Sequence, residues 1–174
     1  FMHTMTLTEK KKSKTGLILQ PTMMDEVEIQ RVFSGQGYMP ADEKFREWFN
    51  LVIKLLQKNG TLVIRLVDEN ESRELNSQYR GKDSSTNVLS FPFEAPPNIE
   101  DNHLGDLVVC VPVVNRESFE QNKAEEHHWA HIVIHGILHL LGYDHIQDVD
   151  AEKMENLEID LLDTLGISNP YEAK

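Results

Sequence analysis

Three histidines near the C-terminal end of the chain have the spacing of metal ligands. His135 and His139 lie four residues apart, so on a helix they occupy one face, where a single divalent metal can bind both imidazoles. Gly142 stands where a left-handed glycine ends a helix, and the chain then returns to His145. Three imidazoles with one open position are typical of catalytic zinc, whereas structural zinc sites are closed by four protein ligands. The pattern H-x-x-x-H-x-x-G-x-x-H therefore predicts a metal centre and metal-assisted hydrolysis.

The residue after the first of these histidines separates the chain from one class of zinc enzymes. Metzincin proteases share the spacing but place a glutamate there, as general base for the zinc-bound water. In this chain the position holds Gly136. The spacing therefore supports the metal, and the glycine argues against the usual protease mechanism. A metallopeptidase or other zinc hydrolase stays an alternative. So does a noncatalytic protein with structural zinc, which a fourth protein ligand would support.

Two residues beside the expected ligands are further candidates for the site. His131 precedes His135 by four residues, but a four-residue stripe drifts by about 40° per step around a helix of 3.6 residues per turn. His131 is therefore a candidate either for the metal itself or for a contact with a ligand or substrate. Asp144 precedes His145 and is suited to orient an imidazole or a water, or simply to form the turn.

The composition is that of one globular domain without disulfide bonds. The chain has 174 residues, of which 40% are hydrophobic, and a single cysteine, Cys110, which we expect in the core. A reducing, cytoplasmic location fits best, since no apolar run could span a bilayer and no signal peptide begins the chain. The net charge of -12 opposes tight nonspecific binding of polyanions. An RNA substrate would therefore require the few Lys and Arg side chains to gather near the metal.

Four stretches of the chain have strand patterns. The first alternates apolar and polar residues, which is typical of a half-buried strand, and the last is almost continuously apolar, as in a strand buried on both faces. Pro92 confines the end of the third to a sheet edge or a bulge, because proline cannot donate a ladder hydrogen bond. The predicted strands are 27–33, 61–67, 86–93 and 104–111.

Five stretches have the spacing of helices. The last one carries apolar residues on one face and, on another face that we expect to be polar, Glu152, Glu155 and Glu158. The order β-α-β-α-β-β-α-α-α predicts an α+β (α/β-like) domain with a small mixed, mostly parallel sheet packed with helices. We expect the histidine helix to lie across the sheet, with its metal ligands facing a cleft. The expected helix starts are Asp42, Asp68 and Asp148, each as an N-cap, together with Pro112 and the stretch after Glu126.

Four sequence stretches resemble the bacterial YbeY family of metal-dependent endoribonucleases, which are linked to ribosomal RNA maturation. These are YRGKD at 79–83, TNVLSFPFE at 86–94, LGDLVVC at 104–110, and the histidine block at 128–145. The resemblance covers roughly residues 27–171. Residues 1–25 carry none of it and are expected to be a disordered N-terminal extension or a tag remnant, with 26–171 as a single metal-hydrolase domain and 172–174 as a tail.

The resemblance implies a single-strand-specific, zinc-dependent endoribonuclease that acts in ribosomal RNA processing, including 16S rRNA 3′ end maturation, and in ribosome quality control. It implies that His135, His139 and His145 bind one zinc per chain, although histidine sites also accept other divalent transition metals. The expected partners are a ribosomal RNA precursor and ribosomal small-subunit proteins, with no DNA and no membrane. With this resemblance, the noncatalytic alternative becomes a ribosome-assembly factor with structural zinc.

The resemblance also implies that Arg80 is functionally important. From the polar turn at 79–83 alone, we would expect Arg80 to be an ordinary solvated side chain. A guanidinium fork near the metal suits a phosphate, because it pairs bidentately and stays charged at all working pH values. We therefore expect Arg80 and His139 to be catalytic, with Lys82 as a further candidate for contact with the substrate.

Overall fold

The computed structural model describes residues 26–144 and 146–172, which form a four-stranded sheet covered by helices. The order of elements along the chain confirms the predicted β-α-β-α-β-β-α-α-α pattern. The elements are β1 (Glu26–Arg31), α1 (Asp42–Leu55), β2 (Thr61–Val67), α2 (Glu69–Arg80), β3 (Val88–Pro92), β4 (His103–Cys110), α3 (Val111–Glu120), α4 (Glu125–Leu140) and α5 (Asp148–Thr164).

The sheet has the strand order β1-β2-β4-β3 and is mixed, as predicted. Strands β1, β2 and β4 run parallel, and β3 pairs antiparallel with β4 at one edge. Pro92 lies in this edge strand, opposite Gly105, where its missing N–H breaks no ladder. Because β3 is an edge strand, one of its long sides has no neighbouring strand, and β3 lines a groove beside α4.

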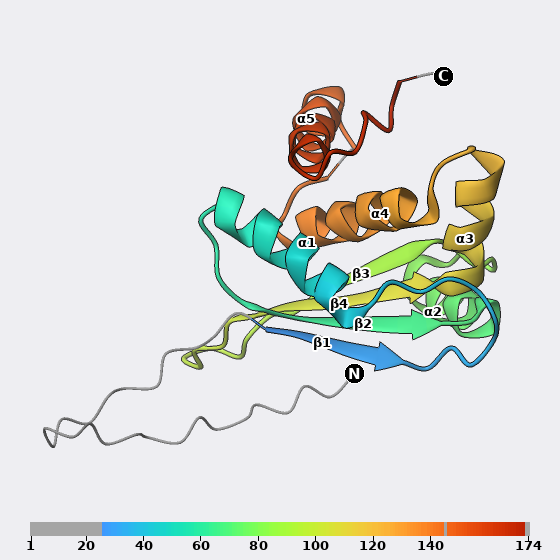
Figure 1. Cartoon of the computed structure of the whole chain (residues 1–174). Coiled ribbons are helices and arrows are strands. Elements are labelled where there is room, and N and C mark those ends of the chain that lie inside the picture. The colour runs from blue at the N-terminus through green and yellow to red at the C-terminus, as the bar shows by residue number, and fades with distance from the viewer. Residues whose placement is uncertain (1–25, 145, 173–174) are drawn as a thin grey trace, which may run out of the picture.

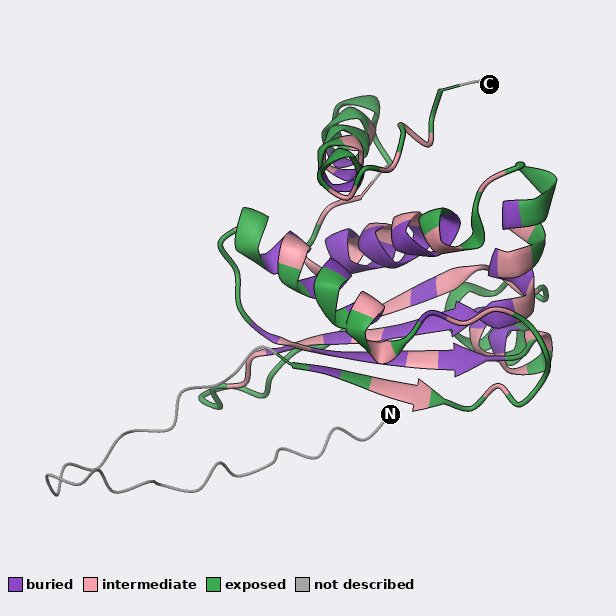
Figure 2. Cartoon of the chain, in the orientation of Figure 1, coloured by how far each residue is buried: buried purple, intermediate pink, exposed green. Residues whose placement is uncertain are grey.

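Helices α1, α4 and α5 form two layers on one face of the sheet, and α2 packs on the other face, where its Leu75 lies against Leu89, Val108 and Cys110. Helices α1 and α4 cover the strands, and α5 packs on α4 on the side away from the sheet (Figure 1). Helix α4 is the most buried helix because it is enclosed between the sheet and α5 (Figure 2). Its aromatic anchor is Trp129, which is fully buried, packs edge-to-face on Phe45 and donates a hydrogen bond to Asn115. This packing fixes the helix that carries the candidate ligands.

Side-chain caps set only some of the helix starts. Asp68 caps α2 as predicted, accepting a hydrogen bond from the Glu71 N–H at 2.9 Å. Asp42 and Asp148 were expected to cap α1 and α5, but both predictions are wrong, because the N-caps are Ala41 and Gln147. The Asp42 carboxylate binds Arg31 instead at 2.6 Å. Cys110 is fully buried, which confirms its expected place in the core.

No helix within the two described ranges is both long enough and apolar enough to cross a membrane. The expected N-terminal extension at 1–25, and residues 173–174 of the expected tail, lie outside the described residues.

Candidate metal centre

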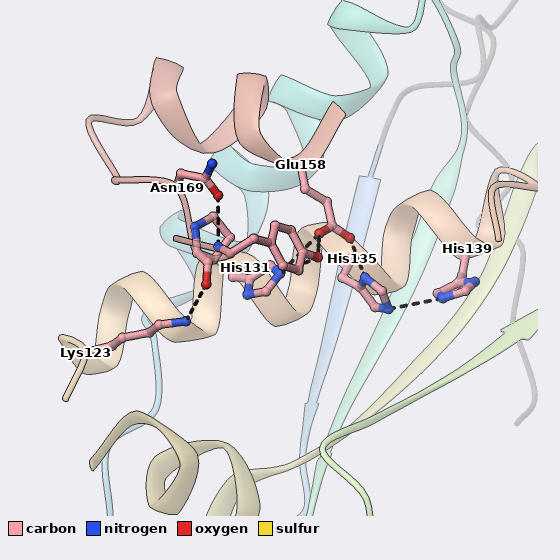
Figure 3. Close-up of polar contacts among 8 residues, drawn as sticks. Lys123, His131, His135, His139, Glu158 and Asn169 are labelled. Carbon is pink, nitrogen blue, oxygen red and sulfur yellow. Dashed lines mark hydrogen bonds and ion pairs between the residues drawn. The ribbon is translucent and has the colours of Figure 1, made fainter. Parts of the chain in front are cut away.

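Two of the three predicted metal ligands face each other on α4. The Nε2 atoms of His135 and His139 lie 3.1 Å apart, with ring planes at 80° (Figure 3). Two imidazole nitrogens on one tetrahedral zinc at about 2.0–2.1 Å are themselves about 3.3 Å apart. The i, i+4 spacing therefore places this pair at a separation that suits one small divalent ion.

The end of α4 has the geometry that the third ligand requires. Gly142 adopts a φ of +96°, and its N–H donates to the His139 carbonyl at 3.0 Å while the Tyr143 N–H donates to the Leu138 carbonyl at 3.1 Å. This is the Schellman arrangement, which ends a helix and reverses the chain. His145 lies outside the described residues, and within 26–144 and 146–172 no three His, Cys, Asp or Glu side chains form a group that could hold a metal. The three-histidine centre therefore depends on His145.

A buried carboxylate contacts the candidate ligands from the opposite side. Glu158 of α5 is completely buried, and its Oε1 accepts a hydrogen bond from His135 Nδ1 (Figure 3). The expectation that Glu158 lies on a polar face of the last helix is therefore wrong. The sequence did contain the signal, since Glu158 lies four residues after Met154 and three before Leu161, in the apolar stripe that packs on the core.

The other oxygen of Glu158 has two donors of its own. His131 Nε2 lies 3.2 Å from Oε2, and the Tyr171 hydroxyl donates to the same atom. Burial raises the pKa of Glu158, but the hydrogen bonds from His131 and His135 outweigh burial and lower that pKa to about 2. Burial and the neighbouring carboxylate raise the pKa of Tyr171 well above its ordinary value. Glu158 is therefore ionised and acts as the acceptor for all three groups.

A groove of about 740 Å³ runs beside the histidine pair. Helix α4 forms one wall, the edge strand β3 forms another, and the end of α2 closes one side. We refer to it as the histidine groove. Arg80 contributes the one permanently charged side chain among its described lining residues, and no acidic side chain lines it. Its lining consists of Tyr79, Arg80, Thr86, Asn87, Val88, Leu89, Ser90, Phe91, Pro92, His131, Ile132, His135, His139 and Tyr171.

The structure brings some of the predicted site residues together and places others apart. His131, His135, His139 and Arg80 all line the histidine groove. Arg80 is the last residue of α2, directly before Gly81, whose left-handed φ of +68° ends the helix. Arg80 is exposed and forms no ion pair with any other residue in the described part of the chain, so its guanidinium can meet a ligand.

Lys82 and Asp144 do not line the groove. Lys82 is exposed and follows the left-handed glycine, where its backbone N–H caps α2 by donating to Asn76. Asp144 accepts a hydrogen bond from the Ile146 N–H at 3.3 Å, which is the turn role that the sequence left open. Asp83 of the YRGKD stretch forms a two-bond ion pair with Arg73 at 2.7 and 2.9 Å, which holds the loop after α2.

Gly136 occupies a close contact between α4 and the sheet. A Cβ atom built there would lie 2.9 Å from Leu107 Cδ2 and 3.3 Å from Val88 Cγ2. The Gly136 carbonyl also accepts a hydrogen bond from the Ser90 hydroxyl of β3 at 3.1 Å. The position that carries the general base in metzincins is thus used here for packing helix against sheet.

Replacing Gly136 with glutamate should destabilise the protein without creating a peptidase. The side chain would push a carboxylate into the contact with Leu107 and Val88, and overpacking together with burial of a charge should cost on the order of 3 kcal/mol or more. Denaturant unfolding of wild type and Gly136→Glu measures the loss. Gly136→Ala is the matched control, with a smaller loss because the end of the Leu107 side chain can shift. Full stability of Gly136→Glu would contradict the packing role.

Comparison with known proteins identifies the family of this chain. The family model described as Endoribonuclease YbeY matches residues 34–166. Endoribonuclease YbeY of Alteromonas mediterranea is 51% identical over an alignment of 152 residues, which covers 84% of this chain and 96% of that protein. The solution structure of TM1509 from Thermotoga maritima covers 84% of this chain and 99% of that one, at 27% identity and a TM-score of 0.52.

The family match spans the end of α2, the edge strand and the whole of α4, so it includes every described residue of the histidine groove except Tyr171. Together with the identity to the Alteromonas protein over most of both chains, it shows that this chain belongs to the endoribonuclease YbeY family.

Proposed function

We propose that this chain is a zinc-dependent, single-strand-specific endoribonuclease of ribosomal RNA processing, acting in the cytoplasm in 16S rRNA 3′ end maturation and in ribosome quality control. Family membership makes it a hydrolase of RNA phosphodiester bonds. The zinc, the ribosomal substrate and the roles of individual residues belong to the proposal. So do small-subunit proteins as partners, and the absence of DNA and membrane partners.

The observation that carries the proposal is the charge of the histidine groove. The whole chain has a net charge of -12, yet no described residue lining the groove is acidic, and Arg80 opens into it beside the histidine pair. A polyanion that the rest of the surface would repel can therefore enter at this place. Of the Lys and Arg side chains that the sequence required near the metal, Arg80 alone lines the groove among the described residues.

The donor set of the groove fits a catalytic zinc. His135, His139 and His145 would hold the ion, and the ion would supply a Lewis acid and a water of lowered pKa. Arg80 would bind the scissile phosphate through its guanidinium fork and stabilise the negative charge that develops there. His131 lies at the same wall, with its Nε2 engaged by Glu158 and 3.3 Å from the Tyr171 hydroxyl, so we assign it to supporting the site.

Two alternatives from the sequence are less well supported. A metallopeptidase would need a base at position 136, where the glycine packs against Leu107 instead. A noncatalytic factor with structural zinc would need a fourth ligand near His135 and His139, and none is present among the described residues. An active endoribonuclease with an open metal position accounts for both observations.

Tyr79 gives the groove a surface suited to unpaired bases. Its side chain is 67% exposed, and its ring packs edge-to-face on Phe91 with centroids 5.0 Å apart. An exposed aromatic ring beside Arg80 can stack on a splayed-out base, which single-stranded RNA offers and a duplex does not. This supports the single-strand preference.

Replacing Tyr79 with alanine should weaken substrate binding more than catalysis. Stacking is worth about 1–3 kcal/mol per base, so KM for a single-stranded oligoribonucleotide should rise about 10-fold while kcat changes little. Steady-state kinetics of wild type, Tyr79→Ala and Tyr79→Phe provide the test. Tyr79→Phe keeps the ring and should behave as wild type. An unchanged KM in Tyr79→Ala would remove the stacking role.

A further inference from the structure

One acidic side chain of α5 differs from its neighbours in burial. Glu152 and Glu155 are exposed, whereas Glu158 is completely inaccessible to solvent between α5 and α4. A buried carboxylate that lacks partners costs several kcal/mol, so its retention depends on the groups around it. Those groups are two imidazoles of α4 and the hydroxyl of Tyr171.

The contact with His135 determines which nitrogen of that ring can bind a metal. Glu158 Oε1 faces His135 Nδ1, and a histidine that ligates a metal ordinarily donates its second ring N–H to such a carboxylate, so His135 donates from Nδ1 to Glu158. The neutral imidazole then has its lone pair on Nε2, the atom that lies 3.1 Å from His139 Nε2. A carboxylate on the far nitrogen of a ligating histidine fixes both tautomer and ring orientation and strengthens metal binding.

The remaining contacts hold the carboxylate itself in place. His131 Nε2, at 3.2 Å, and the Tyr171 hydroxyl engage Oε2, which leaves Oε1 for His135. Tyr171 lies in the segment after α5, where its backbone N–H donates to the Asn169 side chain at 2.8 Å (Figure 3). Lys123, at the other side of this segment, donates to the Pro170 carbonyl at 3.4 Å. The C-terminal segment is thereby tied to the histidine helix.

We infer that Glu158 is the positioning residue of the metal centre, that it holds His135 in the Nδ1–H tautomer, and that Tyr171 and His131 hold Glu158. The sequence pattern of the three ligands does not include Glu158. This residue contacts His135 from α5, which follows the histidine block. The inference rests on the metal centre of the proposed function, but it concerns the orientation of His135 and can be measured without metal.

The test combines a spectroscopic and a binding measurement on the full chain. Long-range ¹H–¹⁵N NMR spectra of the metal-free protein at neutral pH report which ring nitrogen of His135 carries the proton. Chelator competition gives the zinc affinity. The variants are Glu158→Gln, which keeps an acceptor oxygen but removes the charge, and Glu158→Leu, which removes both. Glu152→Gln is the matched control, because it removes an exposed carboxylate from the same helix.

We expect the Nδ1–H tautomer in wild type, in Glu152→Gln and in Glu158→Gln, and its loss in Glu158→Leu. Zinc affinity should fall about 10-fold in Glu158→Gln and about 100-fold in Glu158→Leu. A folded Glu158→Leu with wild-type affinity and an unchanged tautomer would overturn the inference. Should Glu158→Leu not fold, wild-type zinc affinity in Glu158→Gln would overturn it.

The two proposals fail in distinguishable ways. A wild-type protein that binds no zinc would count against the metal in the proposed function, and the tautomer of His135 would then decide the positioning role by itself. A wild-type protein that binds zinc but shows the Nε2–H tautomer when metal-free would refute the role of Glu158 and leave the metal centre standing.

Discussion

Replacing His139 with alanine should abolish both zinc retention and RNA cleavage. The variant removes one of the two nitrogens that lie 3.1 Å apart on α4, and a single helix histidine with His145 does not hold zinc as three imidazoles do. Without the ion, the pKa of water at the site is not lowered toward neutrality, so no hydroxide forms at neutral pH. Elemental analysis and cleavage of a single-stranded oligoribonucleotide measure the two losses.

His127→Ala is the matched control for this variant. His127 lies on the same helix but lines a separate pocket rather than the histidine groove, so its removal should leave zinc content and cleavage near wild type. Chelation of the wild-type metal should reproduce the loss seen in His139→Ala, and added zinc should restore activity in wild type alone. Full cleavage by fully metal-free wild type would contradict the metal-dependent account.

Replacing Arg80 with alanine should leave the zinc in place and remove most of the cleavage. Arg80 makes no ion pair with any residue that the structure describes, and it is not among the predicted ligands, so the metal centre and the fold should survive its loss. Loss of a donor that stabilises developing charge typically costs about 10²–10³ in kcat. Single-turnover cleavage with saturating enzyme isolates this step from binding.

Two further variants separate the guanidinium from general positive charge. Arg80→Lys should recover only part of the activity, because an ammonium is a point charge and does not pair with phosphate in two places. Arg46→Ala removes an exposed arginine of α1 that does not line the groove, and it should cleave as wild type does. Equal losses in Arg46→Ala and Arg80→Ala would show that only net charge matters.

The sequence predicted those parts of the site that depend on local spacing. The i, i+4 pair of histidines and the left-handed Gly142 are properties of one helix and its end, and both are found as expected. The same holds for the cap at Asp68 and for the order of strands and helices. Local hydrogen-bond geometry and side-chain periodicity decide these features, so the sequence carries them directly.

The features that the sequence did not predict depend on contacts between distant segments. The strand order β1-β2-β4-β3 follows from pairings that no local pattern encodes. Asp42 has the residue type of a helix cap, but Arg31 of β1 takes its carboxylate. Glu158 was expected on a polar face because of its charge, although its position in the apolar stripe favours burial. Its partners on α4 are 23 and 27 residues away, so no local pattern revealed them. Charge alone therefore misplaced it.

The most direct test of the account is cleavage of a single-stranded ribosomal RNA precursor by wild type and Arg80→Ala, with zinc measured in the same samples. The account predicts one zinc per chain in both proteins and cleavage by wild type alone. Equal cleavage by both proteins, with zinc present in each, would contradict the role of the groove in RNA hydrolysis.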